Sequence, residues 1–227
     1  MIAIPVRVGK PEAPESLRYV LRSICHHLPD EIPVVCGHAP DWYTGDHIPT
    51  VQDSAEKHGN MGINLLAAVD ALESFAWWSD DVYALKPTPP TVYARPESVD
   101  HLLARVGNIP WRRTLLSQQK ILTSWGYDTS TLLCSESHHP MLMDSARARD
   151  LLDRIARDFP THPLGSFKGL YAAGLEVVPQ KDPKVMYPLK GIEPDATYLS
   201  TTPIVYRQGQ AARELRAMFP TPCRYER

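Results

Sequence analysis

The chain has no long hydrophobic run. Its apolar stretches, such as INLLAAV at 63–69, are far shorter than the roughly 18 residues that suggest a membrane span. The opening MIAIPVRVGK has neither the apolar core nor the cleavage site of a signal peptide. These absences predict a soluble, cytoplasmic protein with no membrane partner.

Excess charge of one sign is also missing. The 24 basic and 26 acidic side chains give a formal net charge of -2, so the whole chain carries no field that would attract nucleic acid or an anionic membrane.

The cysteines are spread out and form no CxxC pair; they are Cys25, Cys36, Cys134 and Cys223. This spacing disfavours a zinc knuckle or a redox dithiol and predicts reduced thiols.

Proline is abundant, with 22 residues against 12 glycines, and it punctuates the whole chain, which favours short elements joined by rigid loops. A length of 227 residues with 43% hydrophobic content suits one domain with one sizeable core. Apolar runs predict strands in IAIPVRV, IPVVCG and FAWW, and helical spacing predicts helices in ESLRYVLRSICHHL and HGNMGINLLAAVDAL. The first 80 residues thus alternate β-α-β-α-β, which predicts an α/β fold with a mostly parallel sheet flanked by helices.

Two adjacent acids, Asp80 and Asp81, follow the third predicted strand directly. Ligands of open α/β sheets bind at the carboxyl ends of the strands, where this pair is expected. Mg²⁺ and Mn²⁺ prefer oxygen ligands and often take only one or two protein carboxylates, leaving room for substrate phosphates. The pair therefore suits a metal-diphosphate site, although a solvated turn would also explain it.

Basic and amide side chains provide further candidates for binding a diphosphate donor. Arg18 and Arg22 are spaced i, i+4 on one helix face and could bind a diphosphate or form a salt bridge. The other candidates lie near a predicted strand end, near the start of the second helix, or just before a proline; they are Arg7, Lys57, Asn60, Asn64 and Lys86. Capping or solvation is the alternative explanation for each of them.

A second chemical cluster lies in ESHHPMLMD. Glu136 and His138 would face the same side of an extended segment, so the acid could orient the imidazole as a base or metal ligand. His139 would face the other way. Asp144 begins the pattern DSARARDLLDRIARDF and is predicted to cap that helix at its N-terminus.

Four segments occur in the order known from one protein family. SLRYVLRSI at 16–24, WWSDDVYALKP at 77–87 and ESHHPM at 136–141 resemble motifs of the Stealth family of sugar-phosphate transferases. The final FPTPCRYER is similar to a short tail of related phage-type glycosyltransferases. Stealth proteins open with a strand close to VYTWVDG, whereas this chain opens with IAIPVRVGK and lacks that acid, which favours the smaller glycosyltransferase relatives.

The resemblance implies a GT-A-like fold, with a nucleotide-sugar-binding half over 1–90 and an acceptor-side half over 91–227. It implies Mn²⁺ or Mg²⁺ at Asp80 and Asp81, a catalytic role for His138 with Glu136, and a donor contact for Lys168. The expected enzyme transfers a sugar from a nucleotide-diphosphate sugar, with a UDP-sugar favoured, to a hydroxyl acceptor. That acceptor is a protein such as a phage virion protein, a glycan, or a hydroxymethylated DNA base. The alternatives are a sugar-1-phosphate transferase and a non-catalytic nucleotide-sugar or glycan-binding module.

Overall fold

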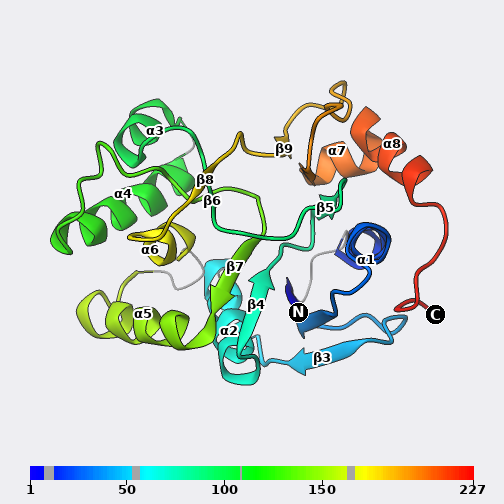
Figure 1. Ribbon diagram of the computed structural model, residues 1–227, viewed down its shortest axis with the longest axis horizontal. Helices are drawn as coiled ribbons and strands as arrows, with labels where there is room; N and C mark the ends of the chain where they lie inside the picture. The colour runs from blue at the N-terminus through cyan, green and yellow to red at the C-terminus, as the bar shows by residue number, and fades with distance from the viewer. Residues whose placement is uncertain (8–12, 53–56, 108, 163–166) are drawn as a thin grey trace.

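The computed structural model describes residues 1–7, 13–52, 57–107, 109–162 and 167–227. Among these, a five-stranded sheet has the order β3-β2-β1-β4-β7 (Figure 1). Its strands are β1 (Ile2–Val6), β2 (Pro33–Gly37), β3 (Asp46–Pro49), β4 (Ser74–Trp77) and β7 (Met141–Asp144). All neighbouring strands in it are parallel except β4 and β7, which are antiparallel. The predicted mixed α/β class with a mostly parallel sheet flanked by helices is confirmed.

Helices cover both faces of this sheet because the buried strands present apolar side chains to both sides. Ile2 and Ile4 of β1 share a core cluster with Leu17 of α1 (Ala13–His27). Ala3, which points the other way, packs in a second cluster with Leu65 of α2 (Lys57–Ala71). The opening strand and both predicted helices are therefore formed, and the two faces of one strand belong to two cores.

The predicted β-α-β-α-β alternation is wrong in one respect, because an extra strand, β3, lies between β2 and α2. Its residues are mostly exposed, and it pairs only with β2, at the edge of the sheet. An edge strand with the sequence DHIP has no apolar alternation to reveal it, and it ends on Pro49. It extends the sheet without changing where the carboxyl ends of β1, β2 and β4 lie.

The remaining strands form two smaller sheets. A three-stranded sheet has the order β5-β10-β9, and β6 pairs with β8. Their bounds are β5 (Val82–Ala84), β6 (Tyr93–Ala94), β8 (Val178–Pro179), β9 (Lys184–Val185) and β10 (Tyr198–Thr201). The predicted halves 1–90 and 91–227 interlock, since β7 completes the sheet of the first half and β5 pairs with β10 of the second.

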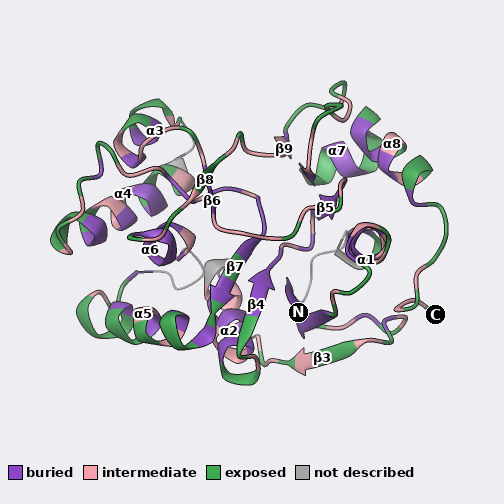
Figure 2. Cartoon of the chain, viewed as in Figure 1, coloured by how far each residue is buried: buried purple, intermediate pink, exposed green. Residues whose placement is uncertain are grey.

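Helices of the second half surround a third core cluster, which includes Leu102, Leu115 and Ile155. These helices are α3 (Val99–Arg105), α4 (Ile109–Ser124), α5 (Ser145–Asp158) and α6 (Lys168–Ala172). The carboxylate Oδ1 of Asp144 accepts a hydrogen bond from the Arg147 amide at 2.8 Å, which confirms the predicted N-cap of α5. The outer face of α5 is exposed, and its inner face is buried (Figure 2).

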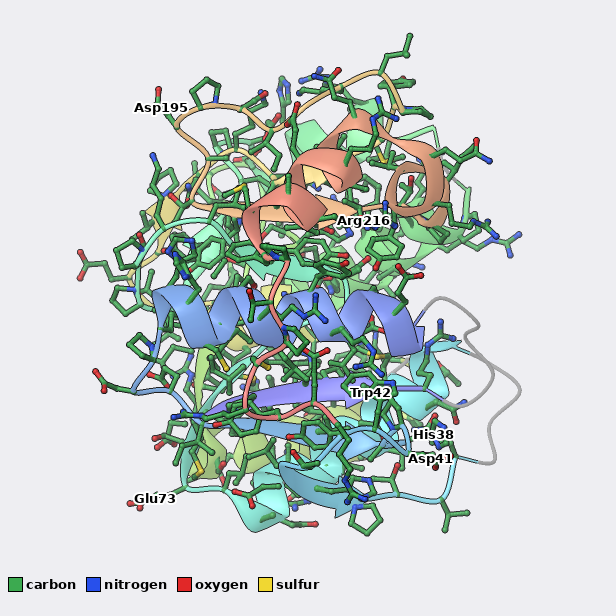
Figure 3. All side chains as sticks on the ribbon, turned by 90° about the vertical axis from the view of Figure 1, so that its right-hand side faces the viewer. His38, Asp41, Trp42, Glu73, Asp195 and Arg216 are labelled. Carbon is green, nitrogen blue, oxygen red and sulfur yellow. The ribbon has the colours of Figure 1, made fainter. Side chains whose placement is uncertain are left out.

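The chain ends by returning to its first helix. After α7 (Pro203–Gln208) and α8 (Gln210–Met218), residues 219–227 form a tail that crosses α1 and reaches the segment around Trp42 (Figure 3). There the Arg227 amide donates to the Trp42 carbonyl at 2.9 Å. None of the helices in the described ranges is long and apolar enough to cross a membrane.

Candidate functional site

Asp80 and Asp81 lie in a tight turn between β4 and β5. The Val82 amide donates to the Ser79 carbonyl at 3.2 Å, and the Trp78 indole Nε1 donates to the Val82 carbonyl at 2.6 Å. Trp78 is fully buried, so it fixes this turn to the core. The acids therefore stand at the carboxyl end of β4, as predicted, with Asp80 buried and Asp81 partly exposed.

The Asp81 carboxylate forms an ion pair with Lys184, the first residue of β9. The Lys184 ammonium lies 2.9 Å from Asp81 Oδ2, and it also donates to Ser200 Oγ at 3.1 Å and to the Thr201 carbonyl at 2.9 Å. The Thr201 amide donates to the Asp81 carbonyl at 3.3 Å. Strands β9 and β10 thus lie directly against the turn that carries the two acids.

Asp182 is the centre of a second set of polar contacts. His138 Nδ1 lies 3.0 Å from Asp182 Oδ1, the Lys184 amide donates to the same oxygen at 2.9 Å, and the Arg95 guanidinium contacts Oδ2. Burial opposes ionisation of Asp182, but the hydrogen bond with His138 and the positive charge of Arg95 hold its pKa well below the usual range. Because a carboxylate only accepts hydrogen bonds, the His138 proton sits on Nδ1 in the neutral ring, and Nε2 is left as a proton acceptor.

The acid that contacts His138 is Asp182, and Glu136 has a different role from the one predicted. Glu136 Oε1 accepts from the Gln118 side-chain amide at 2.7 Å and from the Gly169 amide at 3.0 Å. The segment around Glu136 bends instead of running as an extended strand, so the two side chains do not share a face. Glu136 therefore connects α4 to the start of α6.

Lys168 links the predicted motifs to one another. Its ammonium donates to the Ser137 carbonyl at 3.1 Å and to the His139 carbonyl at 2.7 Å. Burial lowers its pKa, whereas the negative charges of Glu136, Asp182 and Asp81 act in the opposite direction. Lys168 is therefore close enough to all three acids to feel their charge, and the site holds acids and bases in one polar cluster.

His139 is part of the core, and its Nδ1 lies 3.2 Å from Ser137 Oγ. It is buried, with its ring centroid 4.7 Å from that of Tyr93 and 5.9 Å from that of Tyr198. Burial is the main reason why its pKa falls to about 4, so it is neutral at physiological pH. His139 is buried, whereas the His138 side chain is 40% exposed.

Of the predicted donor residues near β1 and α2, Asn64 lies at the carboxyl end of β1. Asn64 is fully buried, and its Oδ1 accepts from Thr50 Oγ1 at 2.7 Å and from Gln52 Nε2 at 3.3 Å. Its Nδ2 donates to the Val6 carbonyl at 3.5 Å, so the Asn64 amide connects the segment that follows β3 to the end of β1. Asn60 on α2 and Arg7 after β1 are both half-buried. The side chain of Lys57 lies outside the described residues.

Arg18 and Arg22 bind the tail. Arg18 NH1 lies 2.8 Å from Glu226 Oε2, and Arg22 Nε lies 2.7 Å from Glu226 Oε1. The salt bridge considered from the sequence is therefore present, and its acid is supplied by the tail. Lys86 lies past β5, with its ammonium 3.9 Å from the exposed Asp195.

Sequence reasoning missed Arg95, Asp182 and Lys184. The segment QKDPKV carries an acid and a base two residues apart, but nothing in its spacing links it to Asp81 or His138. The pairing of β9 with β10, and of β10 with β5, brings it to the site. Only long-range strand pairing makes these residues neighbours.

The expected divalent ion has a restricted set of ligands. Within the part of the chain that the structure describes, no group of three or more His, Cys, Asp or Glu residues is arranged to hold a metal ion. An ion at this site would thus be bound partly by a few carboxylate oxygens and partly by substrate phosphates.

No protein-family model matches the chain, and no curated protein is significantly similar to it.

Proposed function

We propose that the protein is a glycosyltransferase with a GT-A-like fold, which transfers a sugar from a nucleotide-diphosphate sugar to a hydroxyl acceptor. The observation that carries this proposal is a continuous set of contacts that joins Asp81, His138 and Lys168, although they come from segments far apart in the sequence. Lys184 contacts both Asp81 and Asp182, and Asp182 contacts His138. Lys168 donates to the carbonyls of the residues on either side of His138. The resemblance described above assigned a role to each of Asp81, His138 and Lys168 separately.

The sheet topology supports binding of the donor at this place. From β1 the chain proceeds outward through β2 and β3, and it then returns to form β4 on the other side of β1. Such a reversal leaves a crevice outside the carboxyl ends of the two central strands, where nucleotides bind in open α/β sheets. Arg7 follows β1 and Asp80 follows β4, so both lie at this reversal point.

The donor diphosphate is proposed to bind beside Asp81, where Lys184, Lys168 and Arg95 supply positive charge. The hard carboxylate oxygens of Asp80 and Asp81 fit Mn²⁺ or Mg²⁺, provided that Lys184 gives up its contact with Asp81 when the donor arrives. A bound ion would add positive charge against the departing diphosphate. Lys168 and Arg95, which are held by backbone carbonyls, would stabilise the same charge without reorganising.

His138 is proposed to activate the acceptor. Asp182 holds Nδ1–H, so Nε2 can take the proton of the acceptor hydroxyl while its oxygen bonds to the anomeric carbon and the nucleotide diphosphate leaves. The His138 side chain is 40% exposed, which leaves it accessible to an acceptor. This pairing resembles the acid-oriented histidine used as a base in many enzymes, with Asp182 as the orienting group.

Replacing the base tests this assignment. His138→Gln is expected to lower kcat by about 100-fold or more, because a positioned base typically contributes at least that much. Donor affinity should change little, since the proposal gives His138 no contact with the diphosphate. His101→Gln, at an exposed histidine on α3, is the control and should leave both parameters unchanged. Wild-type kcat in His138→Gln would contradict the role.

Ligand-dependent stability tests the function itself. We expect one class of nucleotide-diphosphate sugar, with UDP-sugars tried first, to raise the melting temperature in the presence of Mn²⁺, because a bound ligand stabilises the folded state. Product analysis with donor labelled in the β-phosphate then follows the transferred group. Label in the product would indicate sugar-phosphate transfer instead, and binding without turnover on protein, glycan or hydroxymethylated DNA acceptors would indicate a binding module.

A further inference from the structure

The tail holds a cysteine directly beside a cysteine of α1. Arg22 NH1 donates to the carbonyls of Phe219 and Pro220, at 3.2 and 3.3 Å. Further along, Arg224 donates to the Pro29 carbonyl at 3.2 Å. Along the chain, Arg22 and Pro29 lie on either side of Cys25, and the tail crosses α1 in Figure 3.

The backbone of Cys223 is fixed by the same ion pairs that fix the tail. Its amide donates to Glu226 Oε1 at 3.1 Å, the oxygen that also binds Arg22. Arg22 and Cys25 are three residues apart on α1, so their side chains emerge on neighbouring parts of one helix face. Cys223 also packs against the core cluster that α1 covers. With the tail fixed in this way, the Cys25 and Cys223 side chains are close enough to share a hydrogen bond.

Cys25 and Cys223 differ from the other cysteines in exposure, and they differ from each other in acidity. The hydrogen bond with Cys25, together with burial, raises the pKa of Cys223 well above its usual range. All four cysteines are free, but Cys25 and Cys223 are only partly buried. The neighbouring Cys223 thiol lowers the pKa of Cys25 against the effect of burial, and the charge of Arg224 lowers it further. Burial raises the pKa of Cys36 and of Cys134 to about 12. Cys25 is thus the cysteine whose surroundings favour the thiolate, which is the reactive form.

We propose that Cys25 and Cys223 form a reversible disulfide that locks the tail onto α1. The oxidant is a small-molecule disulfide such as oxidised glutathione. The Cys25 thiolate attacks one of its sulfur atoms and releases one glutathione thiolate, which leaves a mixed disulfide on Cys25. Cys223 then gives its proton to the released glutathione thiolate, and its sulfur attacks the Cys25 sulfur and releases the second glutathione. Two electrons pass to the oxidant, and both thiol protons end on the released glutathione molecules.

The bond would change stability more than shape, because the tail already lies in place. Cys25 and Cys223 are almost the full chain apart, and a cross-link that closes a long loop restricts the unfolded chain strongly. The oxidised protein is therefore expected to melt about 5–10 °C above the reduced protein. Added thiol should reverse the shift.

The full chain tests the proposal directly. Native protein is incubated with oxidised glutathione, its free thiols are alkylated, and the peptides are mapped without reduction. We expect one cross-linked peptide pair that contains Cys25 and Cys223, an intact mass reduced by two hydrogens, and alkylated Cys36 and Cys134 after unfolding. Cys25→Ser and Cys223→Ser should each lose both the cross-link and the change in melting temperature.

The same experiment can overturn the proposal. A lasting glutathione adduct on Cys25 in the wild-type protein would show that Cys223 cannot reach it. Native protein that stays fully reduced under conditions that oxidise a reference dithiol would also contradict the proposal, as would a cross-link that involves Cys36 or Cys134. The wild-type peptide map gives this answer even if a serine variant folds poorly.

Discussion

Asp81→Asn is expected to lower kcat/KM by about 100- to 1000-fold, the size of effect seen when one preorganised electrostatic group is removed from an active site. The change keeps the shape of the side chain but removes its charge. It therefore weakens any divalent ion at the turn and the ion pair with Lys184, which lies 2.9 Å away. Initial rates at several donor and Mn²⁺ concentrations measure the loss.

Stability must be separated from catalysis in this experiment, since Asp81→Asn also leaves Lys184 without its carboxylate. The double variant Asp81→Asn/Lys184→Met removes both charges and should recover much of any lost stability, because the unpaired partner is gone. It should not recover turnover. Asp195→Asn, at a fully exposed acid, is the matched control. Wild-type turnover in Asp81→Asn with saturating Mn²⁺ would remove Asp81 from the mechanism.

Glu226→Ala is expected to lower the free energy of unfolding by about 2–4 kcal/mol, because it leaves two arginines without the carboxylate that pairs them. The Glu226 side chain is completely covered, whereas Arg18 and Arg22 keep 27% and 11% of their side-chain surface exposed. That partial exposure places the expected loss at the lower end of the range for a broken buried pair. Urea unfolding at neutral pH measures it, with Glu176→Gln at an exposed position as the control.

The lowered pKa of the Glu226 carboxylate predicts how the stability of the protein depends on pH. Burial works against ionisation of Glu226, but the hydrogen bonds from Arg22 and Arg18 lower its pKa from 4.5 to about 2. A carboxylate with a lowered folded pKa stabilises the protein above its unfolded pKa, and this stabilisation is lost as the pH falls toward the folded pKa. The stability difference between the wild type and Glu226→Gln should thus be constant above pH 5 and shrink between about pH 4.5 and 2. A difference that does not change with pH would show that the ion pairs contribute little.

The sequence predicted the elements whose buried faces leave a periodic pattern. Leu17, Leu21 and Ile24 form the buried stripe of α1, and Asp144 caps α5 as expected. The strands of the smaller sheets are two to four residues long, too short for a pattern, and they pair with segments far away in the chain. Edge strand β3 escaped prediction because its side chains are mostly exposed.

The candidate site also contains some residues that the sequence predicted and others that it did not. Asp80 and Asp81 were expected at a strand end because an apolar run stops just before them, and His138 stood out as an ionisable residue beside a second acid. Asp182 and Glu226 carried no such signal, since each acts on a partner far away in the sequence. Spacing reveals partners on the same helix or strand, whereas only the folded chain reveals Asp182 beside His138 and Glu226 beside Arg22.

The pairing of β10 with β5 has a consequence for the order of folding. Strand β1 finds both neighbours, β2 and β4, within the first third of the chain, whereas β5 must wait for β10 near the end. Closing a longer loop costs more entropy and slows the formation of the contact. The pairing of β1 with β2 and β4 is therefore expected to form first, and Lys184 is expected to reach Asp81 late. A partly folded chain would thus have the carboxyl ends of β1, β2 and β4 in place before Lys184 pairs with Asp81.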